Sequence, residues 1–104
     1  MNTRFAVLVE FTLASPEVMA PFRVLIDDNA RQSRLLELGC QYFDVLVPSD
    51  ANDRIVLYEI YDSRQAFQAH LGTAHYQAFK TESAHLVASK SVRELELVCD
   101  GAPA

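Results

Sequence analysis

Two of the three histidines in this chain lie in one short stretch, HLGTAHY, which covers residues 70–76. Imidazole is the side chain that exchanges a proton near neutral pH, and the phenol of Tyr76 adds a hydrogen-bonding group beside His75. These residue types at this spacing could form a site for proton transfer. The alternative is a polar corner between two helices, in which His70 is a core histidine satisfied by a backbone carbonyl or by the end of its helix.

The helical spacing of this stretch gives each side chain an expected position. His70 follows Ala66 by four residues and Phe67 by three, so it should point to the buried side of its helix. His75 falls in the first turn of the next helix, where a solvated surface position is the simplest expectation. Tyr76 belongs to the inner face of that helix and is expected in the core with its hydroxyl bonded.

Two further polar residues interrupt apolar faces. Asn29 lies within the apolar stripe of a long predicted helix, and an unpaired buried amide costs about 1–3 kcal/mol. Asn29 therefore either caps a backbone group or faces a ligand cavity. Glu59 shares a strand face with aliphatic side chains. It either forms an ion pair, for example with Arg34 or Arg93, or has a raised pKa and moves protons.

The elements that must position these residues follow from periodicity. Alternating apolar residues predict strands over 4–13, 40–47, 54–61 and about 90–99. Helical spacing and capping residues predict helices from about 17 to 38, ended by Gly39, and over 64–71 and 74–87. This order predicts an α+β, ferredoxin-like split β-α-β fold, with helices on one face of an antiparallel sheet. The strands are apolar on both faces, so we expect a second copy to cover the open face in a homodimer.

Composition narrows the class of protein. The 104 residues predict one domain over 1–104, with 99–104 as a loose tail, and the net charge of −5 argues against nucleic acid or an anionic membrane as partner. With no apolar run of membrane-spanning length and no signal-peptide pattern, we expect a cytoplasmic protein. Cys40 and Cys99 are far apart and are expected to be reduced, and the histidine spacing predicts no metal site. Three glycines leave no room for a phosphate-binding loop or a dinucleotide fingerprint.

The stretch DDNARQSRLLELGCQYFDVLV, followed by RIVLYEIYDSRQAFQAHLGTAHYQAF, resembles the antibiotic biosynthesis monooxygenase family in its quinol monooxygenase-like branch. The motifs are Asn29, the run SR-x-x-E-x-GC, the strand YEIY and the pattern H-x-x-T-x-HY, and the resemblance extends from Phe5 to about Val98. It implies a dimeric α+β barrel of ferredoxin-like subunits, each with a pocket between helices and sheet. It further implies oxidation of a quinol or polyphenol by molecular oxygen with no cofactor.

The resemblance also implies roles for individual residues. His70 would be the base, and Asn29 would donate a hydrogen bond to the substrate or to a peroxy oxygen. His75, Tyr76 and Glu59 would orient the substrate or relay the proton.

Two other functions remain open at this point. A similar pattern occurs in a cofactor-free isomerase of a small phosphorylated ketose, of the type that breaks down autoinducer-2. A phosphate would need cations in the pocket, and the candidates are Arg23, Arg31, Arg34 and Lys80. The third possibility is a non-enzymatic dimeric module that binds a small aromatic or polar ligand.

Overall fold

The computed structural model describes residues 3–103 of the chain. Its elements, in chain order, are β1 (Arg4–Leu13), a 3-10 turn (Pro16–Val18), α1 (Met19–Leu36), β2 (Cys40–Leu46), β3 (Arg54–Tyr61), α2 (Arg64–Leu71), α3 (Ala74–Ser83), a second 3-10 turn (Ala84–Leu86) and β4 (Val87–Leu97). The predicted α+β, ferredoxin-like fold is confirmed. No helix in this part of the chain is both long enough and apolar enough to cross a membrane.

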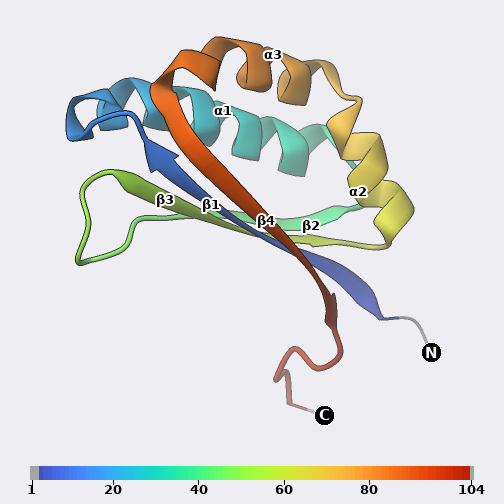
Figure 1. Cartoon of the computed structure of the whole chain (residues 1–104). Helices are drawn as coiled ribbons and strands as arrows, with labels where there is room; N and C mark the ends of the chain where they lie inside the picture. Colours follow the sequence, from blue (N-terminus) through green and yellow to red (C-terminus); the bar gives the residue numbers. More distant parts are fainter. Residues whose placement is uncertain (1–2, 104) are drawn as a thin grey trace.

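The four strands form one antiparallel sheet in the order β2-β3-β1-β4, and the helices lie together on one of its faces (Figure 1). Val9 of β1 stands opposite Leu57 on one side and Val92 on the other. Paired residues in antiparallel strands point to the same face, so these three side chains all face the helices. The core between helices and sheet is built from this face and from the inner side of α1, where Phe22 and Ile26 are fully buried.

The first helix ends two residues before the predicted boundary. Glu37 has an extended backbone, so α1 stops at Leu36 and the residues after it turn toward β2. Gly39 does not cap the helix. A Cβ atom at Gly39 would lie 2.7 Å from the Cβ atom of Ala66 in α2, so the glycine is there because β2 and α2 approach closely.

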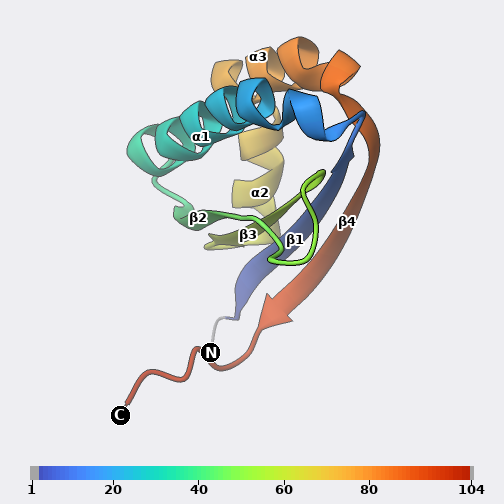
Figure 2. The same ribbon diagram turned by 90° about the vertical axis from the view of Figure 1, so that its left-hand side faces the viewer.

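The last strand is displaced from its predicted position. α3 ends at Ser83 and β4 runs from Val87 to Leu97, rather than from about 90 to 99. The backbone N–H of Ala14 donates to the carbonyl of Leu86, and Val87 pairs with Leu13, so the chain joins the sheet directly after the 3-10 turn. β4 is an edge strand that curves along the side of the sheet (Figure 2). Most of its side chains are exposed.

The second face of the sheet carries no helix (Figure 1). Tyr42, Tyr58 and Leu95 are exposed there. Residues 98–103 follow β4 without regular structure, and Asp100 in this segment forms an ion pair of 2.7 Å with Arg4. Both cysteines are free, as expected, although only Cys40 is buried.

Candidate active site

A cavity of about 250 Å³ lies between the helices and the sheet and opens beside β4. Its walls are mainly aromatic and aliphatic side chains. The polar side chains that line it are Asn29, Glu59, His70, Tyr76, Lys90 and Glu94. An apolar cavity of about 150 Å³ accommodates benzene, so this volume suits a compound with one substituted ring.

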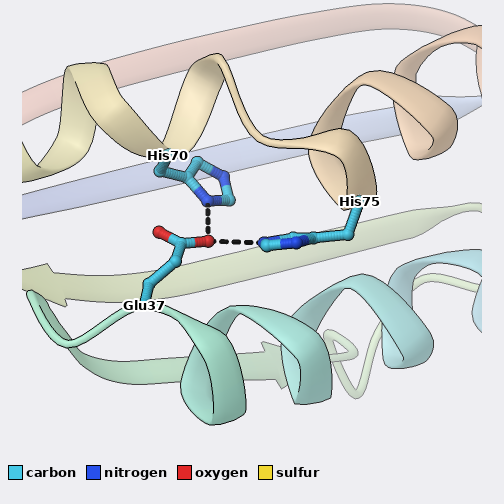
Figure 3. Close-up of side chains that lie close together, drawn as sticks. All are labelled: Glu37, His70 and His75. Atoms are coloured by element: carbon cyan, nitrogen blue, oxygen red, sulfur yellow. Dashed lines mark hydrogen bonds and ion pairs between the residues drawn. The ribbon is translucent and has the colours of Figure 1, made fainter.

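A single carboxylate oxygen joins the two histidines. Oε2 of Glu37 lies 2.8 Å from Nδ1 of His70 and 2.5 Å from Nε2 of His75 (Figure 3). The side chains come from three different elements: Glu37 from the end of α1, His70 from the last turn of α2 and His75 from the first turn of α3. All three are largely buried, with 11% of the Glu37 side chain, 2% of His70 and 5% of His75 exposed.

This arrangement determines which nitrogen of His70 is available to a ligand. The N–H at Nδ1 donates to Glu37, which leaves Nε2 unprotonated in the neutral ring. Nε2 has no hydrogen-bond partner among residues 3–103, and His70 lines the cavity, so this nitrogen is free to accept a proton from a ligand. A carboxylate on the opposite nitrogen also stabilises the imidazolium that forms.

The surroundings of His70 keep its ring neutral. Four aromatic rings, those of Phe43, Tyr61, Phe67 and Tyr76, have centroids between 5.0 and 6.3 Å from the imidazole. Burial lowers the pKa of His70 below its usual value of 6.5, and the hydrogen bond and charge of Glu37 only partly oppose this effect. The imidazole is therefore a neutral base at physiological pH.

Thr73 connects the helices that carry the two histidines. Its hydroxyl donates to the carbonyl of His70 at 2.7 Å and accepts from the N–H of Tyr76 at 3.2 Å. The side chain therefore closes the end of α2 and caps the start of α3. This explains why a threonine lies between His70 and His75 in the pattern H-x-x-T-x-HY.

Asn29 has an unsatisfied polar group in the cavity wall. The residue is 2% exposed, and its Oδ1 has no hydrogen-bond partner within residues 3–103. A buried acceptor without a hydrogen bond destabilises the folded protein by about 1–3 kcal/mol. A ligand that donates a hydrogen bond to it would remove this penalty. The amide nitrogen of the same side chain is the group that could donate to a ligand oxygen.

Glu59 forms a second buried polar pair with Tyr61. The phenol of Tyr61 donates to Oε1 of Glu59 at 2.6 Å, and Glu59 makes no ion pair with Arg34 or Arg93. Burial raises the pKa of Glu59 to about 7, against the smaller opposing effects of the Tyr61 hydrogen bond and the positive charge of Lys90. Burial also raises the pKa of Tyr61 well above its usual value. Glu59 thus exchanges a proton near neutral pH, in the wall of the cavity.

The cluster of Glu37, His70 and His75 also contains the donor atoms of a possible metal site, since one oxygen and two nitrogens lie within 4.8 Å of one another. Ligand atoms about 2.1 Å from a tetrahedral ion are separated by roughly 3.4 Å. The oxygen-to-nitrogen distances of 2.5 and 2.8 Å are shorter and are those of charge-assisted hydrogen bonds. The sequence prediction of no metal site therefore overlooked a plausible donor set, whose present geometry favours bridging protons.

The structure places four of the five predicted site residues in the cavity wall: Asn29, Glu59, His70 and Tyr76. The expectation of a surface position for His75 is wrong, because its ring turns inward to Glu37. His75 reaches the cavity only through Glu37 and His70.

Sequence reasoning missed Glu37 and Lys90 as members of the site. A signal for Glu37 was present, because Asn29, Ser33 and Glu37 repeat every four residues and so lie on one helix face. Ser33 is fully buried, and its Oγ lies 3.4 Å from Nδ1 of His70. Leu36, the last residue of α1, is exposed and does not belong to this buried face.

The cations proposed for a phosphate lie elsewhere. Arg23 is exposed and pairs with Asp27, and Arg34 lies over the ring of Tyr42 on the surface. Arg31 and Lys80 are also exposed, and none of these four residues lines the cavity.

Comparisons with known proteins agree with this architecture. The profile of the family described as "Antibiotic biosynthesis monooxygenase" matches residues 4–82. The chain is 30% identical over 87 residues to "Putative monooxygenase Rv0793" of Mycobacterium tuberculosis. The aligned residues cover 84% of this chain and 83% of the relative. The solved structure of that relative superposes with a TM-score of 0.85 at 27% identity, over 95% of this chain and 99% of the other.

A second solved structure is similar over almost its whole length. It is described as "Putative antibiotic biosynthesis monooxygenase from Nitrosomonas europaea" and superposes with a TM-score of 0.90 at 25% identity, over 98% of this chain and 97% of the other. Both relatives carry the word monooxygenase in their names, which supports an enzyme of this kind. The fold, the matched segment and the resemblance in sequence agree, and the chain belongs to the antibiotic biosynthesis monooxygenase family.

Proposed function

We propose that this protein is a cofactor-independent monooxygenase that oxidises a quinol or a related phenol with molecular oxygen. The observation that carries the proposal is the Glu37–His70 pair. It places a neutral imidazole with a free Nε2 in the wall of an apolar cavity of single-ring size. A quinolate reduces oxygen far more readily than a quinol, so removal of a proton is the step that the protein must assist.

The reaction balances without any further reductant. His70 takes the phenolic proton, and the quinolate passes electrons to O₂ while a C–O bond forms at a ring carbon. The peroxide anion takes the proton back from the imidazolium of His70 and becomes a ring hydroperoxide. The O–O bond then breaks, and the terminal OH leaves as water with the hydrogen of the same ring carbon, which becomes a carbonyl. One oxygen atom enters the ring, and the quinol supplies all four electrons as it becomes a hydroxyquinone.

The polar groups around His70 have parts in this scheme. Glu37 stabilises the imidazolium that forms on His70, and His75 holds Glu37 in place. Asn29 bonds the developing oxyanion or the second hydroxyl of the substrate. Glu59 in its protonated form and Tyr76 are further donors to the ring oxygens.

The experiment is oxygen uptake by metal-stripped protein with a panel of single-ring quinols and catechols, after subtraction of autoxidation. We expect uptake in the wild type and a loss of about 10²- to 10⁴-fold in His70→Ala, the usual range for removal of a general base. A His85→Ala variant is the matched control, because this third histidine is exposed and lies outside the cavity. Undiminished uptake in His70→Ala would refute the role of His70.

The cavity lining and further assays on the same protein distinguish the two alternative functions. The isomerase of a phosphorylated ketose loses the four cations proposed for it, because Arg23, Arg31, Arg34 and Lys80 do not line the cavity. Among residues 3–103, Lys90 is the one lysine or arginine in the cavity wall that remains for a phosphate. The non-enzymatic binding module would be favoured if aromatic compounds bind but neither oxygen uptake nor proton exchange on a phosphorylated ketose occurs.

We also propose that the protein is a homodimer that packs the open face of one sheet against that of a second copy. That face is not covered by helices, and Tyr42, Tyr58 and Leu95 are between 37% and 48% exposed on it. An apolar sheet face of this kind is normally buried against another layer. Light scattering at micromolar concentration should give twice the mass of the chain, and the mass of one chain would refute the proposal.

A further inference from the structure

The mouth of the cavity carries a cation for which the reaction scheme has no use. Lys90 belongs to β4, opposite Phe11 in the sheet register, and this position turns its side chain toward the helices. Its ammonium lies 5.5 Å from the ring centre of Phe11 and 5.8 Å from that of Tyr76. Both distances are within the range of a cation–π contact, so the charge is held over the cavity opening.

The ammonium of Lys90 makes no ion pair with any residue from 3 to 103. The nearest acid on the same strand face, Glu94, is engaged by Arg64 at 2.6 Å. Glu59 lies deeper in the wall, and burial keeps part of its population protonated near neutral pH. The cavity therefore has a positive charge at its entrance that its own carboxylates do not fully compensate.

The effect of Lys90 on its neighbours agrees with this orientation. After burial and the hydrogen-bond effects, the charge of Lys90 contributes to lowering the pKa of both Glu59 and His70. These residues line opposite walls of the cavity, from β3 and α2. The ammonium is therefore within electrostatic reach of both walls, and its contacts with Phe11 and Tyr76 place it at the cavity that a ligand would occupy.

We infer that Lys90 binds an anionic substituent, so that the substrate is a single aromatic ring with a carboxylate or a comparable acidic group at the end away from His70. The aromatic walls hold the ring, Asn29 and His70 meet its hydroxyl groups, and the acidic group remains at the open edge beside β4. This inference rests on the proposed function for the hydroxyl groups of the ring, but the binding of the acidic group is independent of turnover.

The test compares three compounds that differ in one substituent: hydroquinone, 2,5-dihydroxybenzoate and its neutral analogue 2,5-dihydroxybenzamide. Dissociation constants are measured by calorimetry under argon, for the wild type and for Lys90→Gln, Lys90→Arg and Arg31→Gln. Arg31 is exposed on α1, outside the cavity, so its replacement makes the same change in net charge.

We expect the benzoate to bind the wild type about tenfold more tightly than the benzamide at low salt, with the advantage reduced at about 0.5 M salt by screening. The advantage should disappear in Lys90→Gln and remain in Lys90→Arg and Arg31→Gln. An equal preference for the benzoate in the wild type and Lys90→Gln would overturn the inference, as would the absence of any preference in the wild type.

The same compounds separate this inference from the proposed function. Oxidation of hydroquinone that depends on His70, without a preference for the benzoate, would leave the oxygenase intact and refute the role of Lys90. Binding of the benzoate that depends on Lys90, without oxygen uptake for any of the three compounds, would support the anion site and refute the oxygenase.

Discussion

The free energy of unfolding of this protein should depend on pH because of one buried acid, Glu59. The residue is 3% exposed, and burial raises the pKa of its carboxyl group from the usual 4.5 to about 7. The folded state therefore holds a proton that the unfolded chain releases between these two values. Stability from this group is complete below pH 4.5 and is lost as the pH rises to about 7.

The magnitude follows from the size of the shift. A pKa raised from 4.5 to about 7 corresponds to about 3 kcal/mol, and most of this free energy is lost between pH 5 and pH 8. Glu59→Gln replaces the carboxyl group with a neutral amide whose oxygen still accepts from Tyr61, at 2.6 Å in the wild type. The variant should therefore gain stability relative to the wild type as the pH rises, by about 2 to 3 kcal/mol over this range.

The assay is urea denaturation at 25 °C at pH 5, 6, 7 and 8, with the same protein concentration throughout. Burial lowers the pKa of His70, so its contribution has the opposite sign: it is complete above pH 6.5 and is lost as the pH falls below that value. This contribution cancels in the difference, because both proteins contain His70. Glu82→Gln on the exposed side of α3 is the control, because it makes the same substitution at a solvent-exposed position. A constant difference between Glu59→Gln and the wild type would refute the argument that Glu59 is buried and protonated.

Three further predictions follow from the site and its supports. Glu37→Gln should reduce oxygen uptake at least about tenfold, because the imidazolium of His70 loses its carboxylate partner. Glu37 raises the pKa of His70, so the acidic limb of the pH–rate profile should move to lower pH in this variant, and an unchanged limb would contradict the role of Glu37. Gly39→Ala should cost about 1–3 kcal/mol in urea denaturation, because its Cβ would clash with that of Ala66, whereas Gly72→Ala, whose nearest contact is an ordinary 3.6 Å, should cost clearly less. Removal of metal by a chelator should leave uptake unchanged, and recovery of lost uptake on addition of one metal ion would refute cofactor independence.

The thiol of Cys40 shows why a polar residue in this core need not be part of the chemistry. Burial raises the pKa of Cys40 to about 12, and the negative charges of Glu37 and Glu59 act in the same direction. The thiolate that a nucleophile requires is therefore suppressed. Cys40 packs at the start of β2 and donates weakly to the carbonyl of Tyr42.

Local sequence determined the elements and their order. The alternation in 4–13 and 54–61 and the caps at Ser63 and Thr73 are properties of short segments, so the boundaries of β1, β3 and α2 were predicted to the residue. The inward positions of Asn29 and His70 also followed from their periodicity, whereas periodicity left open whether Glu59 forms an ion pair or lies buried with a raised pKa. The ends of α1 and β4 did not, because they depend on contacts with other elements, such as the pairing of Val87 with Leu13.

The site itself was decided by tertiary structure. Glu37 and His70 are 33 residues apart, and only the packing of α1 against α2 and α3 brings one carboxylate to both histidines. The position of Lys90 depends on the register between β4 and β1, which no local pattern in either strand specifies. Local periodicity states which side of an element a residue occupies, whereas hydrogen bonds and charges act between elements, and so the chemistry emerges only when they are packed together.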